Sequence, residues 1–343
     1  MNIEPAKIRV RCTGDGNTFK VCDQAVHPSI IYDTKRQLFT IGITPYPFGD
    51  PRFENPSVLF SRDLRLLLDH NSNNPLLPPP PDSAIGGHYA DPEIFYFNNK
   101  MHMLIGVTSK ALKMDGYLYF TINAQGKRTS EPVFIDIPFS KNVSLSVICG
   151  DRDCYYWTVN PGAKPFEITL YRVTWDSFPH PSSRMKVKYE ITYNGEKWNV
   201  WHLSVRRTNS GKYYMLAAAN PVGSWNGSPP MHLFLLGSND GSYFEDFYGK
   251  PLIAADKVSR IWHLYRSDFM ILNGRIEGLV SYSNTGLLGV YAEKHRGSIV
   301  QKGVTYLYKR LGRYSYREWF LARFIAPWGD KGLSEKTNNV INS

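Results

Sequence analysis

Long apolar runs are missing from this sequence, and none of its apolar stretches approaches the roughly 20 residues that a membrane-spanning helix needs. Residues 1–7 contain no apolar segment of the kind found in signal peptides, so we expect none here. No stretch shows the periodicity of an amphipathic helix, which favours an all-β chain. These absences argue against a helical membrane protein and predict no membrane partner.

Cysteine is also scarce, with four residues in a chain of 343. Cys12, Cys22, Cys149 and Cys154 form neither a CxxC pair nor a spacing with histidine that is typical of a metal site. We therefore expect no metal or other cofactor, and free thiols in a reducing compartment. Disulfides within the pairs Cys12/Cys22 and Cys149/Cys154 are the alternative.

The charge is unbalanced, because 40 lysine and arginine residues face 30 acidic ones, which gives a formal net charge of +10. The basic residues are spread along the chain. We therefore expect a solvated surface and no specific nucleic-acid binding, with a basic patch for nucleic acid or membrane as the alternative. Hydrophobic residues make up 42% and aromatic residues 14%, which is enough for a sizeable core of half-buried strands.

A hairpin pattern occurs five times along the chain. In its second copy, residues 88–97 and 100–105 flank Asn98 and Asn99, which tolerate the positive φ that a two-residue hairpin turn requires. The third positions of the five copies are separated by 64, 53, 58 and 64 residues. These positions are Ser29, Glu93, Ser146, Ser204 and Asp268. A loose period of this size, built of strands and turns, predicts a propeller.

We predict an all-β fold, a five-bladed β-propeller over residues 25–297, nearly without helix. Residues 1–24 form a short N-terminal lead-in with a strand over 8–12. Third strands of the blades are expected within 53–61, 117–121, 168–173, 232–238 and 288–292. Residues 298–343 form C-terminal strands, over 304–310 and 314–325, and a tail. These strands either close the ring or dock the propeller onto other proteins.

Polar residues stand at the start of each inner strand. In a propeller the innermost strand of each blade lines the central channel, so these starts meet at one mouth of the channel. The predicted polar ring consists of His27, Ser29, Asp91, Glu93, Ser144, Ser146, His202, Ser204, Arg266 and Asp268. Structural hydrogen bonding near the channel would explain each residue singly. Together they are the best candidate for a ligand site.

Four short runs carry a resemblance to a known family. They are Asp91-Pro92-Glu93-Ile94, His27-Pro28-Ser29-Ile30, Glu54-Asn55-Pro56-Ser57 and Tyr265-Arg266-Ser267. The pattern resembles the β-propeller of glycoside hydrolase family 43 and its relatives. More closely, it resembles the glycosidase-like propeller of bacteriophage tail and neck proteins, with residues 44–58 as the most specific part. The resemblance covers roughly residues 25–295.

The family-43 resemblance implies three catalytic carboxylates on the inner strands, with one Asp as general base, a second Asp that orients, and a Glu as general acid. This chain departs from that pattern in blades one, three and four. Their positions hold His27, Ser29, Ser144, Ser146, His202 and Ser204. Asp91 and Glu93 remain in blade two and Asp268 in blade five, whereas Glu54 lies in a different strand.

We therefore expect a non-catalytic structural or recognition protein of a bacteriophage virion, from the tail or neck. Other virion proteins are its expected partners, and a host surface polysaccharide is a candidate ligand. The expected ligand-binding residues are His27, Glu54, Asp91, Glu93, His202, Arg266 and Asp268. The expected lack of a signal peptide fits assembly in the host cytoplasm and a final location in the virion.

Two alternatives stay open. The first is an active glycoside hydrolase that acts on a host polysaccharide through Glu54, Asp91 and Glu93. The second is a bacterial sugar-binding propeller.

Overall fold

The computed structural model describes residues 2–13, 19–69, 74–224, 231–255, 263–285, 298–310 and 317–328. This part of the chain is nearly all β, as predicted, with five short 3-10 helices and one α-helix. No helix among these residues is long and apolar enough to cross a bilayer.

The strands form five units, each of which begins with an inner strand and its antiparallel partner. Unit 1 contains β4 (Ala25–Asp33), β5 (Leu38–Pro45), β6 (Ser57–Ser61) and β7 (Leu66–Leu68). Unit 2 contains β8 (His88–Phe97), β9 (Lys100–Ser109), β10 (Met114–Ile122) and β11 (Val133–Ile135). Unit 3 contains β12 (Val143–Cys149), β13 (Asp153–Asn160), β14 (Glu167–Thr174) and β15 (Ser183–Glu190).

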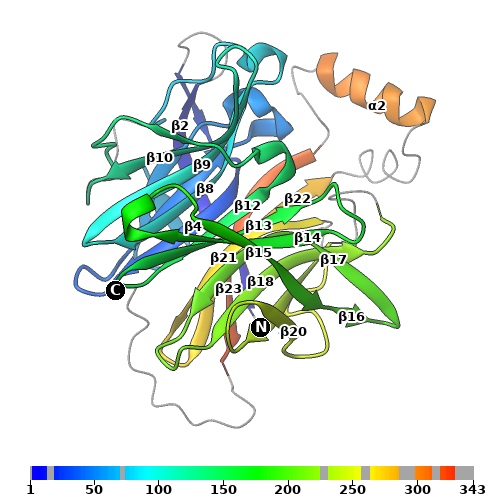
Figure 1. The fold of residues 1–343 in the computed structure, drawn as a ribbon. Coiled ribbons are helices and arrows are strands. Elements are labelled where there is room, and N and C mark those ends of the chain that lie inside the picture. The colour runs from blue at the N-terminus through cyan, green and yellow to red at the C-terminus, as the bar shows by residue number, and fades with distance from the viewer. Residues whose placement is uncertain are drawn as a thin grey trace.

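The last two units follow the same plan. Unit 4 contains β16 (Thr192–Tyr193), β17 (Glu196–Arg207), β18 (Tyr213–Pro221), β19 (His232–Ser238) and β20 (Tyr243–Asp246). Unit 5 contains β21 (His263–Leu272), β22 (Arg275–Thr285) and β23 (Arg317–Pro327). The inner strands β4, β8, β12, β17 and β21 contact one another in this order, and β21 contacts β4, so the five units close a ring (Figure 1).

Local sequence signals explain the hairpins. Asn98 and Asn99 have φ of 50° and 58°, as predicted for the turn of unit 2. Asn273 and Gly274 repeat this geometry in unit 5, with φ of 49° and 71°. Such left-handed pairs match the twist of the flanking strands, so each tight turn fixes the register of its hairpin.

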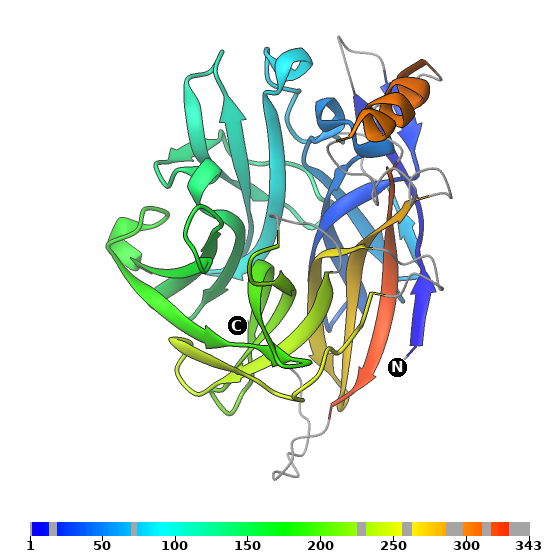
Figure 2. The ribbon, with the colours of Figure 1, turned by 90° about the vertical axis from the view of Figure 1, so that its right-hand side faces the viewer.

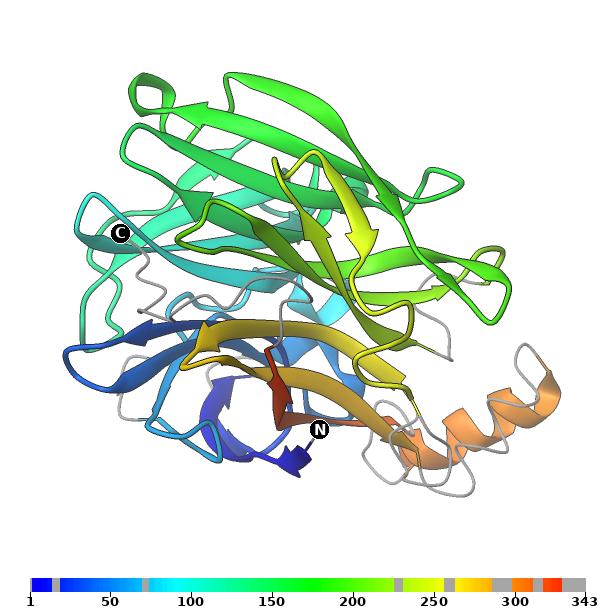
Figure 3. The same cartoon turned by 90° about the horizontal axis from the view of Figure 1, so that it is seen from below.

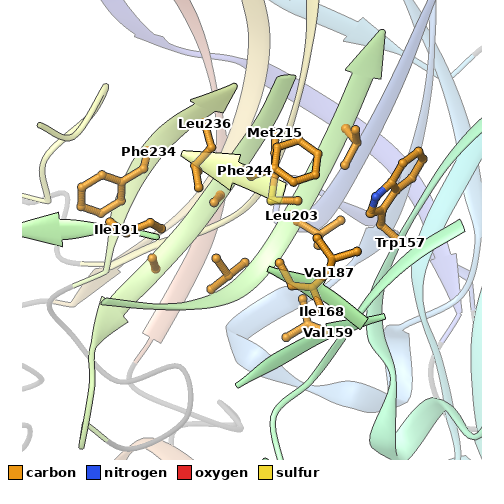
Figure 4. Close-up of a cluster of buried hydrophobic side chains, with 14 of the residues drawn as sticks. Trp157, Val159, Ile168, Val187, Ile191, Leu203, Met215, Phe234, Leu236 and Phe244 are labelled. Atoms are coloured by element: carbon orange, nitrogen blue, oxygen red, sulfur yellow. The ribbon is translucent and has the colours of Figure 1, made fainter. Parts of the chain in front are cut away.

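The core lies between neighbouring units. In one cluster, Trp157 and Ile168 of unit 3 pack with Leu203 and Phe234 of unit 4 (Figure 4). The buried indole N–H of Trp157 donates to the carbonyl of Gly241 at 3.0 Å. Apolar residues on both faces of each sheet therefore hold the ring together.

The two chain ends add strands to the ring. β1 (Asn2–Pro5) pairs with β23, and β2 (Lys7–Thr13) pairs with β7 and with β3 (Phe19–Cys22). Figure 2 shows β23, in red, beside β22. The predicted third strand at residues 288–292 lies outside the described residues, and β23 is the strand that follows β22 in the sheet.

The strand predicted over residues 304–310 is wrong, because these residues belong to the helix α2 (Ile299–Arg310). Val304, Tyr306 and Tyr308 alternate as in a strand, yet Val304, Leu307 and Tyr308 also have helical spacing. Such a short run satisfies both the period of a strand and that of a helix, so the sequence alone did not distinguish the two structures. Figure 3 shows α2 projecting from the body of the molecule.

The expectation of free thiols is also wrong, because the structure pairs all four cysteines. Cys12 and Cys22 join β2 to β3, and Cys149 and Cys154 close the hairpin of unit 3. Each pair lies on two antiparallel strands, which the absence of a CxxC motif did not reveal. Paired cysteines fit an oxidising environment.

Gly278 in β22 tests the tight packing of unit 5. A Cβ there would lie 2.3 Å from the backbone oxygen of Asp268 and 2.7 Å from the ring of Phe324. Gly278→Ala is therefore expected to lower the free energy of unfolding by about 1–3 kcal/mol, the usual cost of overpacking, in urea denaturation. Gly150→Ala, whose Cβ would meet nothing closer than 3.9 Å, is the matched control. Equal stability of the two variants would contradict this packing.

Candidate functional site

All five inner strands carry a shift in register near their start. The shifts fall between Val26 and Ser29, Ala90 and Glu93, Val143 and Ser146, Val200 and His202, and Leu264 and Ser267. At three of them a non-glycine residue has left-handed backbone, with φ of 56° at His27, 54° at Asp91 and 60° at Ser144. Bulges re-aim side chains, and strained backbone of this kind gathers at functional sites.

The predicted polar ring divides into two layers. The first, here called the mouth cluster, consists of His27, Glu54, Asp91, His202 and Tyr265. The second, here called the inner network, consists of Glu93, Arg206 and Asp268. Arg266 joins the layers, because its Nη1 lies 3.2 Å from Asp91 Oδ1 and its Nη2 lies 2.9 Å from Glu93 Oε2.

Asp91 is the centre of the mouth cluster. Its Oδ1 lies 3.4 Å from His27 Nε2 and 4.0 Å from His202 Nδ1. Its Oδ2 accepts a hydrogen bond from the backbone N–H of Ser144 at 2.9 Å. Burial raises the pKa of Asp91, but His27 and Arg266 lower it further, so its net pKa falls below the usual value and the carboxylate is ionised.

The two histidines are almost fully buried. Burial lowers the pKa of His27 to about 4 and that of His202 to about 3, so both rings are neutral near pH 7. His27 Nδ1 lies 3.0 Å from Thr44 Oγ1. Neither nitrogen of His202 has a hydrogen-bond partner among the residues that the structure describes. A buried imidazole without hydrogen bonds destabilises the fold, and a bound ligand would supply the missing partner.

Glu54 reaches the cluster from outside the inner strands. It follows the 3-10 helix η2 (Pro51–Phe53), which Asp50 caps by accepting from the N–H of Arg52 at 3.0 Å. Glu54 Oε1 lies 3.9 Å from His27 Nδ1. Burial, with added repulsion from Asp91 and Asp50, raises the pKa of Glu54 well above its usual value, which favours the protonated form of this carboxyl.

Aromatic rings form the wall of the mouth. The ring centre of Tyr265 lies 4.2 Å from that of His202 and 5.4 Å from that of His27. Trp319 of β23 packs behind Tyr265 at 5.1 Å. Sequence reasoning did not select these two residues, because aromatic residues are common in every strand of the chain and only the closed ring brings these two to the mouth.

The inner network is enclosed by the inner strands. Glu93 accepts from Ser29 Oγ at 3.1 Å and from the N–H of Val147 at 3.1 Å. Asp268 accepts from the N–H of Ile30 at 2.6 Å and pairs with Arg206. Glu93 and Asp268 are 0% and 1% exposed.

Of the seven predicted ligand-binding residues, five therefore line or support the mouth. Glu93 and Asp268 lie below it and tie the inner strands together. Arg206, which sequence reasoning missed, is the partner they share, with Nη1 3.7 Å from Glu93 Oε1. Its position two residues after Ser204, on the same side of β17, was the signal that could have revealed it.

Comparisons with known proteins show the fold. No family model matches the sequence, and no curated protein matches it. An N-acetylgalactosamine deacetylase from F. plautii, solved with blood group B trisaccharide, has 15% identity and a TM-score of 0.67, with 94% of this chain and 95% of that chain covered.

Two glycosidases are also similar. A thermostable family-43 glycoside hydrolase has 14% identity and a TM-score of 0.56 over 76% of this chain and 84% of that one. An α-L-arabinofuranosidase from Podospora anserina, solved with cellotriose, has 12% identity and a TM-score of 0.57 over 95% and 98%. The chain therefore has the propeller-type fold of these carbohydrate enzymes.

Proposed function

We propose that this protein binds a carbohydrate over the mouth cluster and hydrolyses an acyl substituent of it. The observation that carries the proposal is the set of buried polar atoms without an internal hydrogen bond, Asp91 Oδ1 and both nitrogens of His202, beside the protonated Glu54. Perturbed titratable groups that converge on one spot are typical of functional sites. The solved neighbours with the same fold are named for carbohydrates as substrates or ligands, which supports the substrate class.

Cleavage of a glycosidic bond fits this geometry less well. It needs two carboxyl groups on opposite sides of the bond, one protonated and one ionised. Glu93 is enclosed by Ser29, Val147 and Arg266, so it does not reach a substrate at the mouth. Asp91 is ionised but is held by Arg266 and by Ser144. Glu54 is thus the one protonated acid that the cluster offers.

Acyl hydrolysis makes smaller demands. It needs one group that takes a proton from water and returns it to the leaving atom, and donors near the oxygen that becomes negative. The proton transfer is assigned to Glu54, because a raised pKa suits a carboxyl that gives its proton to the leaving atom and is restored by a proton from the attacking water. The TM-score of 0.67 to the F. plautii deacetylase, against 0.56 and 0.57 for the two glycosidases, favours an N-acetylated sugar as substrate.

The test measures two products in parallel. The protein is incubated with N-acetylated and O-acetylated oligosaccharides, and with arabinan and xylan, while acetate and new reducing ends are quantified. Acetate without reducing ends is expected. Glu54→Gln should lower the rate by about 10²–10⁴-fold, the usual contribution of a general acid–base group. Glu131→Gln, at a side chain that is 91% exposed, is the matched control and should keep the rate.

Other outcomes of this test are equally informative. Reducing ends that disappear in Glu54→Gln would favour the glycosidase over the proposed activity. Binding of a glycan without formation of any product would indicate a non-catalytic recognition protein.

A second candidate function is a non-catalytic recognition protein in the tail or neck of a bacteriophage particle, with other virion proteins as partners and a host surface glycan as ligand. The run Thr44-Pro45-Tyr46-Pro47 to Glu54-Asn55-Pro56-Ser57, which resembles phage propellers, favours it. The two disulfides suit a particle that leaves the cell. Mass spectrometry and imaging of purified particles should then locate the protein, and the product assay should stay negative.

A further inference from the structure

We infer that His27, Asp91 and His202 form a binding site for one divalent cation of the first transition row, with Zn²⁺ as the natural probe. One ligand atom from each residue lies within 4.8 Å of the other two. All three residues are buried at the mouth of the channel. The inference rests on the proposed function, because the metal ion would lie in the same mouth cluster and would polarise the acyl carbonyl of the substrate.

The distances suit a small cation. With ligand bonds of about 2.1 Å, a tetrahedral zinc site places its ligand atoms about 3.4 Å apart. Asp91 Oδ1 lies 3.4 Å from His27 Nε2 and 4.0 Å from His202 Nδ1. A small rotation of the His202 ring would therefore complete the triad. A set of two imidazoles and one carboxylate binds transition metals in preference to Ca²⁺ or Mg²⁺.

The hydrogen bonding around the triad points to a missing ligand. Both nitrogens of His202 and Oδ1 of Asp91 have no hydrogen bond within the described part of the chain. A buried polar group without a partner costs about 1–3 kcal/mol. The outer atoms are satisfied, because His27 Nδ1 lies 3.0 Å from Thr44 Oγ1 and Asp91 Oδ2 accepts from Ser144. At His27 and Asp91 the outer atom is held, as it is in ligands of a metal ion, whereas His202 has no outer partner among the described residues.

The charge balance also allows a cation. Arg266 lies 3.2 Å from Asp91 and would repel a metal ion. It is neutralised by Glu93, and in the two layers together three carboxylates, of Asp91, Glu93 and Asp268, face the guanidinium groups of Arg206 and Arg266. The two layers therefore contain more carboxyl groups than guanidinium groups, which favours a cation over an anion.

Three protein ligands leave at least one position for water or a substrate oxygen, as in catalytic rather than structural zinc sites. Glu54 lies on the far side of His27, 3.9 Å from Nδ1. It is not a ligand in this arrangement and keeps the role in proton transfer that the proposed function gives it.

The experiment measures metal binding directly, without substrate. Full-length protein freed of any affinity tag is dialysed against a chelator and titrated with Zn²⁺ by calorimetry, and bound metal is counted by elemental analysis. One Zn²⁺ per chain is expected. His202→Gln and Asp91→Asn should each weaken binding by more than the roughly 10–100-fold that loss of an outer partner costs, and Thr44→Val should weaken it within that range.

His180→Ala, at an exposed histidine, is the matched control and should bind Zn²⁺ like the wild type. Because a triad variant could lose metal by unfolding, each variant is also checked by circular dichroism and by its shift in Tm on adding Zn²⁺. A folded wild type that binds no Zn²⁺, or folded triad variants that bind it as well as the wild type, would overturn the inference.

The two proposals fail separately. Stoichiometric Zn²⁺ binding without acetate release from any acetylated glycan sustains the metal site and removes the acyl hydrolysis. Acetate release by a folded protein that binds no Zn²⁺ removes the metal site and sustains the hydrolysis.

Discussion

Asp268→Asn is expected to lower the free energy of unfolding by about 3–5 kcal/mol, which is the usual cost of removing one partner from a buried ion pair. The Asp268 carboxylate accepts from the backbone N–H groups of Ile30 and Phe269, from Ser204, and from Arg206. Its four donors come from β4, β17 and β21, so one side chain ties three inner strands. The amide keeps the size of the side chain but leaves Arg206 buried without a counter-charge.

Urea unfolding followed by tryptophan fluorescence measures this change. Glu131→Gln, at the exposed end of the pair with Arg128, is the control and should change stability by less than about 1 kcal/mol. The double variant Arg206→Met with Asp268→Asn should recover part of the loss, because no buried charge is then left unpaired at that position. A single variant as stable as the control would show that the inner network does not hold the ring.

The sequence predicted the parts of the fold that depend on local signals. Asn98 and Asn99 set a turn that any two-residue hairpin needs, and the apolar run within residues 232–238 gives the strand β19 at those bounds. The five repeats also place the starts of the inner strands together. These features depend on residues that are close together in the sequence, so they can be predicted without knowledge of the tertiary structure.

The division of the polar ring into two layers could not be predicted in the same way. His27 and Ser29 stand two residues apart in one strand, as do Asp91 and Glu93, so a regular strand would point both members of each pair to the same side. The register shifts at His27 and Asp91 change this, because His27 contacts Asp91 in the mouth cluster whereas Ser29 contacts Glu93 in the inner network. A left-handed histidine or aspartate has no sequence signature of its own.

In the proposed function, the carboxyl groups of the two layers have different roles. The enclosed carboxylates Glu93 and Asp268 stabilise the ring, whereas Glu54, from a loop, supplies the proton-carrying acid at the mouth. Stability and catalysis are thus assigned to different carboxyl groups. The effect of a substitution in one layer can therefore be measured independently of the effect of a substitution in the other. Stability should follow the inner network, and product formation should follow the mouth cluster.

The strand β23 joins these two roles. It lies between β1 and β22, and its Leu321, Ala322 and Phe324 are almost fully buried. Arg323 pairs with Glu277 of β22 at 2.7 Å. Trp319 supports Tyr265 at the mouth. The strand is thus part of both the core of unit 5 and the wall of the candidate site.

A chain that ends after Ser298 lacks β23 and is expected to lose cooperative unfolding, because the edge of β22 and the apolar faces of unit 5 become exposed. Phe324→Ala gives a graded version and should cost about 3–5 kcal/mol in urea denaturation, the usual loss for a buried phenylalanine. Phe320→Ala, at a half-buried position of the same strand, should cost less. If the shortened chain unfolds cooperatively at the wild-type urea concentration, β23 is an attachment and not a structural part of the ring.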